Sequence, residues 1–316
     1  MIKILANDGI EAEAKSLLEA AGFHVETEKV AQDKLMSELQ KYEVITVRSA
    51  TQVRKELIDA CPNLKVIARG GVGVDNIDVD YAKSKGINVI TTPAASSRSV
   101  AELALAHILS LSRFVHNANR DMATGDFKKL KNNYAAGIEL KGKTIGIVGF
   151  GRIGQELAKL AMGIGMKVLY SDPILPETLL EIELYTTHTE KINVTLKASS
   201  FDDILKHADF ISVHTPSLKK PLIGAEELAK MKKGVFIINC ARGGVIDETA
   251  LLESLNNGHI GGAGLDAFIN EPTPNPALLN HARISVSPHI GASTNEAQKN
   301  IGKELAEKIT AHFAKK

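Results

Sequence analysis

The stretch that decides the fold is Lys143-Thr144-Ile145-Gly146-Ile147-Val148-Gly149-Phe150-Gly151-Arg152-Ile153-Gly154. A short β-branched run leads into a G-x-G-x-x-G turn, and a helix-forming run over residues 155–162 follows it. This order of strand, turn and helix is typical of a dinucleotide-binding βα unit. In such a unit the first glycine permits a tight turn, the second lets the backbone approach a pyrophosphate, and the third allows helix and strand to pack closely. The N-terminus of the helix then offers free N–H groups to the phosphates.

An acidic residue stands where this kind of unit requires one. The next predicted strand, Lys167–Tyr170, runs into Asp172, which lies 18 residues after Gly154. About 20 residues is the usual distance to the carboxylate that accepts the adenosine ribose hydroxyls. Since a carboxylate there repels a 2′-phosphate, the sequence predicts NAD rather than NADP. The alternative is that the glycines form only a tight turn and that Asp172 starts a surface loop.

The rest of the chain repeats this alternation in two series. Helical patterns separate most of the strand-like runs, which predicts βαβ units and parallel sheets. We therefore expect an α/β fold with two Rossmann-like, doubly wound domains. The expected strands are Ile2–Asp8, His24–Val30, Tyr42–Arg48, Leu64–Ala68 and Ile87–Thr91 in the first series, and Lys143–Gly149, Lys167–Tyr170, Phe210–His214, Val235–Asn239, Gly264–Phe268 and Arg283–Val286 in the second.

A long helical stretch joins the two series. The capping-box pattern from Ser99 to Glu102 is expected to open a helix that runs to about Met122, and Gly125–Gly137 reads as a polar connector. His107 falls in the middle of that helix and is expected to serve packing or an interface. The last stretch, residues 295–316, reads as an amphipathic helix that packs back on the first series. The predicted domains are therefore 1–97 with 292–316, and 98–291.

Composition excludes several classes of protein. The 316 residues carry 38 Lys plus Arg and 37 Asp plus Glu, a balance that argues against a nucleic-acid or membrane-surface partner. No apolar run approaches the ~18–20 residues of a spanning helix, and the N-terminus has no signal-peptide core. Only Cys61 and Cys240 are present, which favours a cytoplasmic location. No His/Cys cluster has metal-ligand spacing, so no metal site is expected.

Polar residues follow four strands of the second series. Because ligands bind beyond the carboxyl ends of parallel strands, these loops are expected to converge on the cofactor. An Arg can clamp a carboxylate, a His can carry a proton near neutral pH, and a Glu can tune that His, which makes Arg242, Glu271 and His289 candidates for a carbonyl/alcohol redox site. Alternatively, His289 is a hydrogen-bonded loop residue and Arg242 a structural ion-pair partner. The four loops are His214-Thr215-Pro216, Cys240–Gly244, Asp266–Pro272 and Ser287–Ala292.

A second glycine-rich loop follows a strand of the first series. It reads Arg69-Gly70-Gly71-Val72-Gly73-Val74-Asp75-Asn76 and lacks a third glycine at the required place. It therefore fails as a dinucleotide fingerprint. Its clustered N–H groups still suit a small anion.

Together these residues resemble the D-2-hydroxyacid dehydrogenase family, and within it the D-3-phosphoglycerate dehydrogenases. The resemblance covers nearly the whole chain and includes the spacing of 29 residues from Arg242 to Glu271 and 18 from Glu271 to His289. It rests on Val47–Thr51, Arg69–Asn76, Ser99–Glu102, Gly149–Gly154, His214–Pro216, Asn239–Gly244, Leu265–Pro272 and Pro288–Ala292.

The resemblance implies a site for each ligand. Arg242 would hold the substrate carboxylate and C2 oxygen, His289 would take the hydroxyl proton as hydride leaves C2, and Glu271 would stabilise the imidazolium. The implied NAD-binding residues are Gly149, Gly151, Arg152, Ile153, Gly154, Asp172, His214, Thr215, Pro216, Cys240, Ala241, Arg242, Asp266, His289, Gly291 and Ala292. The implied substrate-binding residues are Arg48, Ser49, Arg69, Gly70, Gly71, Val72, Gly73, Arg242 and His289, with Arg48 and Arg69 as candidates for a phosphate.

The resemblance also implies a function. It points to NAD-dependent oxidation of D-3-phosphoglycerate, the opening step of serine biosynthesis, by a homodimer or homotetramer whose substrate domain is the discontinuous one. Reduction of another 2-keto acid, such as hydroxypyruvate or glyoxylate, is the alternative, and a dinucleotide-sensing corepressor is an alternative of another class.

The sequence departs from the family pattern at several places. Val72 and Ser96 stand where Thr and Asn are more usual. The segment between Asp172 and His214 is roughly ten residues longer than usual, and no role is assigned to its part Glu183–Lys191. No regulatory domain is expected after Lys316.

Overall fold

The first sheet is apolar on both faces because its strands are parallel and covered by helices on each side. In the strand Lys3–Ala6, Ile4 packs on one face of the sheet and Leu5 on the other. The strand order is β2-β1-β3-β4-β5. The strands are β1 (Lys3–Ala6), β2 (His24–Glu26), β3 (Val44–Val47), β4 (Val66–Arg69) and β5 (Asn88–Thr91). One face is covered by α1 (Ala12–Ala20) and α13 (Asn295–Ala314), and the other by α2 (Leu35–Glu38), α3 (Lys55–Ala60) and α4 (Val79–Ser84). The short 3-10 turns η1 (Gln32–Lys34) and η2 (Leu39–Lys41) flank α2.

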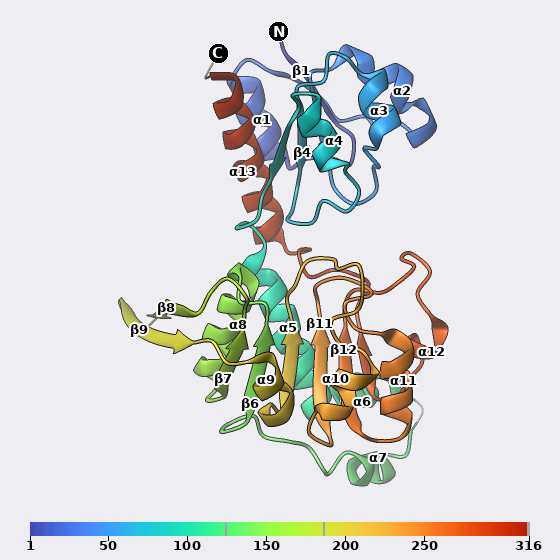
Figure 1. Cartoon of the computed structure of the whole chain (residues 1–316), viewed down its shortest axis with the longest axis vertical. Helices are drawn as coiled ribbons and strands as arrows, with labels where there is room; N and C mark the ends of the chain where they lie inside the picture. The colour runs from blue at the N-terminus through green and yellow to red at the C-terminus, as the bar shows by residue number, and fades with distance from the viewer. Residues whose placement is uncertain (124, 186, 315–316) are drawn as a thin grey trace. The chain divides into compact units, whose positions relative to one another are not determined.

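The second sheet has six parallel strands in the order β13-β12-β11-β10-β6-β7. Helices cover both of its faces (Figure 1). The strands are β6 (Thr144–Val148), β7 (Lys167–Ser171), β10 (Phe210–Val213), β11 (Val235–Asn239), β12 (Ile260–Leu265) and β13 (Ile284–Val286). One face carries α5 (Ser97–Ser112) and α8 (Arg152–Gly163), and the other α9 (Phe201–His207), α10 (Ala225–Lys230) and α11 (Glu248–Asn256), while α12 (Pro276–Leu279) precedes β13.

This computed structural model describes residues 1–123, 125–185 and 187–314. The chain divides into two units, Met1–Ser97 with Ala292–Lys316, and Arg98–Gly291. The α/β class with two doubly wound parallel sheets is confirmed. The expected return of the C-terminal helix is also confirmed, since Ile301, Leu305 and Ile309 of α13 join the core of the first sheet.

Each sheet has one switch point, where the strand order reverses. In the first unit it lies between β1 and β3, and in the second between β6 and β10. Such points create the crevices in which open α/β sheets bind ligands. The Gly149 turn follows β6 and His214 follows β10, so both border the switch point of the second unit.

The helix that links the two series differs from the sequence expectation. It begins at Ser97, so Ser99 lies inside it and cannot act as an N-cap; Glu102 accepts a hydrogen bond from the Arg98 side chain instead. It also ends at Ser112 rather than near Met122, because Phe114 takes a left-handed φ of 56°. Beyond that break lies α6 (Val115–Asp121). The expected polar connector contains α7 (Phe127–Asn133), whose first turn is capped by Asp126.

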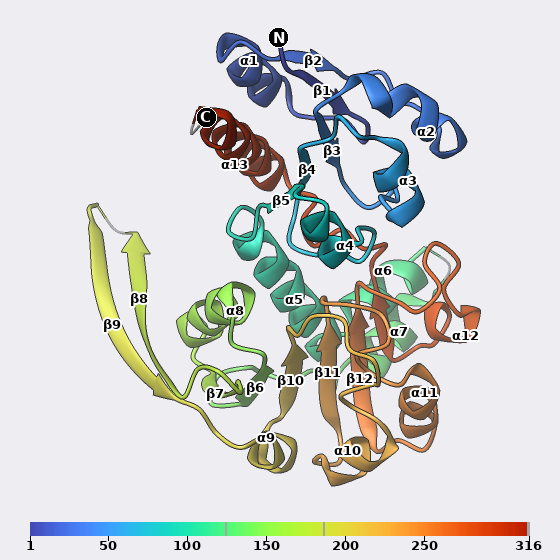
Figure 2. The ribbon, with the colours of Figure 1, turned by 45° about the horizontal axis from the view of Figure 1, so that its top comes forward.

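The longer segment after Asp172 forms an antiparallel hairpin of β8 (Glu177–Tyr185) and β9 (Thr189–Lys197). Figure 2 shows it extending from the second unit beside α8. Its apolar residues alternate with charged ones, and Leu180 near its base joins the core under α8. Side chains nearer its tip, such as Leu184 and Ile192, are exposed. The hairpin accounts for the extra length of this segment.

Candidate active site

The Gly149–Gly154 turn has the backbone that its sequence predicts. Gly149 has a φ of 88°, and a Cβ there would lie 2.7 Å from the His214 carbonyl oxygen. A Cβ on Gly154 would lie 2.5 Å from the Gly149 carbonyl oxygen, so that glycine permits the turn and helix to pack closely. A Cβ on Gly151 would meet nothing within 4 Å, and α8 begins at the next residue, Arg152. The turn therefore offers open space directly before a helix N-terminus, which fits a pyrophosphate.

Asp172 fastens this turn from the end of β7. One carboxylate oxygen accepts the N–H of Phe150 at 2.8 Å, and the other accepts those of Ile174 at 2.9 Å and Leu175 at 3.2 Å. The sequence suggested only a ribose contact for Asp172. The structure adds a positioning role, because the same carboxylate fixes the glycine turn.

The loop after β10 lies against the glycine turn and contains polar atoms without partners. The His214 ring contacts the Ser212 hydroxyl through Nε2 at 2.9 Å. Its Nδ1 and the Thr215 hydroxyl are buried with no hydrogen-bond partner in the described part of the chain. Burial lowers the pKa of His214 to about 4, so the ring is neutral at physiological pH. Unpaired polar atoms beside a glycine turn fit a cofactor that brings its own donors and acceptors.

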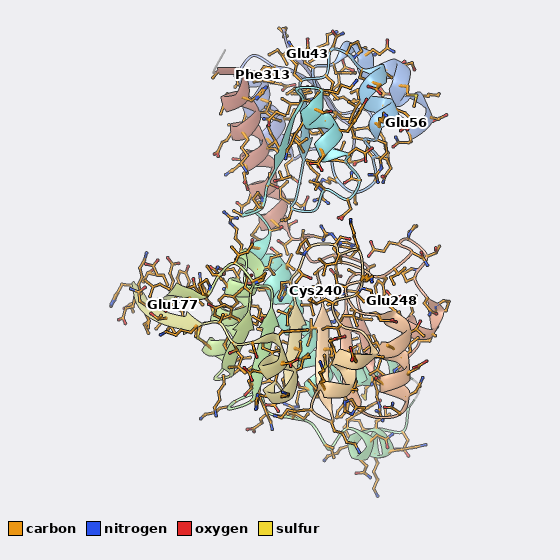
Figure 3. The ribbon with its side chains drawn as sticks, in the orientation of Figure 1. Glu43, Glu56, Glu177, Cys240, Glu248 and Phe313 are labelled. Carbon is orange, nitrogen blue, oxygen red and sulfur yellow. The ribbon has the colours of Figure 1, made fainter. Side chains whose placement is uncertain are left out.

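The Arg242 loop is held rigid by the residue that ends β11. The Asn239 side chain accepts the Ala241 N–H at 3.0 Å and donates to the Arg242 carbonyl at 2.8 Å. A Cβ on Gly243 would lie 2.0 Å from the Phe268 carbonyl oxygen, so this loop and the loop that carries Glu271 pass within contact distance. Cys240, labelled in Figure 3, is buried at this end of the sheet, and its burial raises the pKa of the thiol.

Glu271 and His289 form the central pair of the site. Nδ1 of His289 lies 2.8 Å and 3.0 Å from the two carboxylate oxygens of Glu271. Glu271 also accepts the Phe268 N–H at 3.0 Å, which fixes the orientation of its carboxylate. The His289 side chain is 45% exposed, and its Nε2 has no partner among the described residues. The pair can therefore move a proton at Nε2 while the carboxylate stabilises the charged ring.

The loop that carries His289 is strained and tied down. His289 has a φ of 54°, a left-handed conformation that costs energy for a residue with a side chain. Asp266, 1% exposed, accepts the N–H of Ile290 at 2.9 Å on one oxygen and that of Gly291 at 2.9 Å on the other. Asp266 thus holds the backbone directly after His289. The sequence associated Asp266 with the cofactor and did not reveal this second role.

The predicted substrate-binding residues other than Arg242 and His289 lie in the first unit. Asp8 accepts the N–H of Arg48 at 2.7 Å, and Asn76 donates to the Arg48 carbonyl at 2.8 Å. Nη1 of Arg69 donates to the carbonyl of Gly70 at 2.9 Å, so its guanidinium curls over its own loop. Asp8 and Asn76 were not singled out from the sequence as site residues, since only their contacts reveal that they shape the Arg48 turn. Ser49 and Val72 are exposed, and Gly71 and Gly73 belong to the same loop as Arg69.

Within residues 1–123, 125–185 and 187–314, no helix is long and apolar enough to span a membrane. Across that same part of the chain, no three His, Cys, Asp or Glu side chains gather in a way that could hold a metal ion.

Comparison with known proteins identifies the family. Residues 105–291 match the family described as "D-isomer specific 2-hydroxyacid dehydrogenase, NAD binding domain". The chain is 43% identical over 313 residues to a hydroxypyruvate reductase of Thermotoga maritima, with 97% of each protein covered. It is 42% identical over 313 residues to a D-3-phosphoglycerate dehydrogenase of Bacillus subtilis, covering 98% of this chain and 56% of that protein. The solved TT0316 protein of Thermus thermophilus superposes with a TM-score of 0.86 at 30% identity, over 100% of this chain and 98% of the other.

The matched residues 105–291 include the glycine turn, Arg242, Glu271 and His289. The chain therefore belongs to the D-isomer-specific 2-hydroxyacid dehydrogenase family and uses NAD as its cofactor.

Proposed function

We propose that this dehydrogenase oxidises D-3-phosphoglycerate to 3-phosphohydroxypyruvate. The single observation that carries its catalytic part is the contact of 2.8 Å between His289 Nδ1 and Glu271. A proton-transferring histidine backed by a carboxylate is what oxidation of a secondary alcohol needs. A corepressor would need the nucleotide site but not this pair, so the pair favours an enzyme.

Each residue of the site has a defined task in this reaction. Bound NAD supplies a nicotinamide ring that accepts the hydride from C2. Arg242 pairs with the substrate carboxylate and fixes the C2 oxygen near His289, because a guanidinium binds carboxylates in a defined orientation. Nε2 of His289 takes the C2 hydroxyl proton, and the carboxylate of Glu271 stabilises the imidazolium that results. In the reverse direction His289 returns that proton to the carbonyl oxygen.

The substrate assignment rests on the anion-binding groups of the first unit. One carboxylate is already matched by Arg242, so a substrate with a second anionic end needs further donors. Arg48 and Arg69 supply cationic groups, and the Val72 and Gly73 amides supply N–H groups, within one unit. The N–H groups of Gly70 and Gly71 already donate to the Val47 carbonyl at 2.9 Å and the Thr92 hydroxyl at 2.8 Å. We assign the substrate phosphate to Arg48 and Arg69. Cys61 and Cys240 are both free thiols, which supports a cytoplasmic site of action.

Hydroxypyruvate reduction is the second candidate. Its support is the relative of 43% identity, a hydroxypyruvate reductase that this chain matches over 97% of its length. The two candidate keto acids share one carbon skeleton and differ by the phosphate on C3. The same catalytic residues serve both, and only the anion-binding groups of the first unit distinguish them.

Steady-state assays on matched substrates separate the two candidates. The purified chain is assayed with NADH on 3-phosphohydroxypyruvate and hydroxypyruvate, and with NAD on 3-phosphoglycerate and D-glycerate, with the L-isomer of glycerate as the stereochemical control. The proposal predicts a higher kcat/KM for the phosphorylated member of each pair. A higher kcat/KM for hydroxypyruvate would assign the chain to the second candidate.

We also propose that the chain forms a homodimer through the α5–α7 region. Four large apolar side chains there are exposed, namely Leu109 at 44%, Val115 at 54%, Met122 at 52% and Phe127 at 68%. Large apolar side chains exposed on consecutive elements of a chain are typical of an interface between subunits. Light scattering at micromolar concentration tests this, and a monomer there would contradict it.

A further inference from the structure

A buried histidine is connected to the catalytic loop through two side chains. His107 of α5 is 4% exposed. Its Nε2 lies 2.9 Å from the Ser287 hydroxyl, and its Nδ1 lies 2.9 Å from the Ser285 hydroxyl. Ser287 in turn lies 2.6 Å from the carboxylate of Asp266. This is the carboxylate that binds the backbone after His289.

The donor and acceptor capacity of each group determines which atom carries the proton in each of these hydrogen bonds. An ionised carboxylate can only accept, so the Ser287 hydroxyl donates to Asp266. The Ser287 oxygen is then the acceptor for the N–H on Nε2 of His107. In a neutral ring this leaves Nδ1 as an acceptor, which the Ser285 hydroxyl can fill. The three side chains form one directed series of donors that ends on Asp266.

Burial favours the neutral His107 ring that these donor and acceptor assignments require. Burial lowers the pKa of His107, and the charge on Asp266 opposes that effect only in part. His116 is the other titratable group near the ring, and its charge acts in the same direction as burial.

Strand β12 leaves room for the His107 ring because it has a glycine, Gly264, at the point of contact. A Cβ on Gly264 of β12 would lie 2.6 Å from the His107 Cβ, so any larger residue would push α5 and the ring away. Ser287 is also held through its main chain, since its N–H donates to the Leu265 carbonyl at 3.0 Å and its carbonyl accepts the His289 N–H at 3.1 Å. Ser287, the member of the series between His107 and Asp266, is therefore fixed by its own backbone contacts.

We propose that His107 is a positioning residue for His289, acting through Ser287 and Asp266 to hold residues 287–291 in the strained conformation that points the His289 ring at Glu271. Ser287, Ile290 and Gly291 are all bonded to one carboxylate, and His289 lies between them in sequence. If the orientation of Asp266 is lost, the strained residue is free to relax. This inference rests on the proposed function only for its kinetic readout.

The test compares two substitutions at one position. His107→Leu fills the space of the ring with an apolar side chain and removes both hydrogen bonds, whereas His107→Gln retains one donor and one acceptor. The matched control is His259→Leu, which removes a histidine of the same unit that bonds the Leu228 carbonyl instead. Ser287→Ala is the second variant, for use if His107→Leu does not fold, because Ser287 is only half-buried and its loss breaks the same series. Thermal unfolding of each variant establishes that it folds.

Two readouts are measured on each protein. We expect kcat to fall about tenfold in His107→Leu and Ser287→Ala with KM changed less than about twofold, since a small misplacement of a catalytic group lowers the chemical step. His107→Gln and His259→Leu should stay within about threefold of the unaltered chain in kcat. In ¹⁵N-histidine-labelled protein, the Nδ1 resonance of His289 should change in His107→Leu and not in His259→Leu.

The outcomes separate this inference from the proposed function. If the unaltered chain turns over neither 3-phosphoglycerate nor hydroxypyruvate, the proposed function fails, while the His289 resonance still decides the positioning role. An unchanged kcat together with an unchanged His289 resonance in His107→Leu would overturn the inference. Equal losses in His107→Leu and His107→Gln would also overturn it, because they would reflect packing rather than hydrogen bonding.

Discussion

The two sheets of this protein share a topology but use their switch points differently. In the second unit the strands β6 and β10 end beside the Gly149 turn, where Gly151 leaves open space before α8. In the first unit Asp8, which follows β1, is already bonded to the turn of Arg48 after β3. Residues of α13 pack over that point, and a cavity of about 10 Å³ remains among Gly9, Thr46, Arg48, Gly70, Ile301 and Leu305. Such a cavity holds no more than one water molecule.

This difference shows what strand order does and does not determine. The order of the strands places a crevice at each reversal, but the residues after the strands decide whether the crevice is left open. Two glycines and a helix start keep one switch point open. A carboxylate and a helix from the far end of the chain fill the other, which belongs to the unit that carries Arg48 and Arg69.

The largest effect is expected at His289 in the second unit, the unit whose switch point is open. His289→Ala should lower kcat by about 10³-fold, because general acid–base catalysis typically contributes 10²–10⁴-fold. NADH affinity, measured by fluorescence titration, should stay within about twofold, since the glycine turn is untouched. Retained turnover in this variant would show that His289 does not transfer the proton. The proposal that the second unit carries the acid–base chemistry would then lose its main residue.

The second effect concerns stability at the open switch point. Burial lowers the pKa of His214 to about 4, below the ~6.5 of an unfolded chain, so the unfolded state binds the extra proton between these values. Stability from this group is therefore complete above about pH 6.5 and is lost as the pH falls towards 4, by about 3 kcal/mol in total. His214→Gln should flatten the dependence of the unfolding free energy on pH in that window.

Chemical denaturation at a series of pH values measures that dependence. Burial also lowers the pKa of His107 and His281, so the decisive quantity is the difference between His214→Gln and the unaltered chain. The two curves should diverge between pH 6.5 and 4. Parallel curves would show that the switch point admits water and that His214 is not held neutral by burial.

The third effect concerns the filled switch point. Arg48→Ala should reduce kcat/KM for 3-phosphoglycerate by about 10–150-fold, since a charge-assisted contact contributes about 1.5–3 kcal/mol and about 1.4 kcal/mol equals a tenfold change. The kcat/KM for hydroxypyruvate should barely change. Arg54→Ala is the matched control, because Arg54 belongs to the same unit and pairs with Asp78. Equal losses on both substrates would mean that Arg48 does not contact the phosphate.

Local sequence patterns predicted the sheets and the glycine turn well. Strands such as Val44–Val47 are buried along their whole length, as is typical of a sheet covered on both faces, and the spacing from Gly149 to Asp172 is itself a local signal. The start of α5 was predicted wrongly because a Ser-x-x-Glu pattern describes a possible cap, whereas the Arg98 side chain takes Glu102 in the structure.

The tertiary contacts of the site could not be predicted in this way. His107 and Ser285 are 178 positions apart in sequence and meet only because α5 packs against β12 and β13. The second role of Asp266 has the same origin, since its partners Ile290 and Gly291 follow a different strand. The residue types of the site were readable from the sequence, whereas the contacts that orient them depend on how distant strands are paired.

The smallest effect tests the premise that one switch point is open. Gly151→Ala adds one methyl group where nothing lies within 4 Å, so the fold should tolerate it, yet that methyl would occupy the space proposed for the pyrophosphate. We expect NADH to bind about tenfold more weakly, a loss of about 1.4 kcal/mol, with kcat at saturating cofactor nearly unchanged.

The matched control is Gly163→Ala at the other end of α8, where a Cβ also meets nothing within 4 Å. Fluorescence titration should find NADH affinity unchanged in that control, and thermal unfolding should find both variants folded. Should the two variants bind NADH equally well, the space at Gly151 would not be the cofactor site, and the contrast between the two sheets would rest on Arg242, Glu271 and His289 alone.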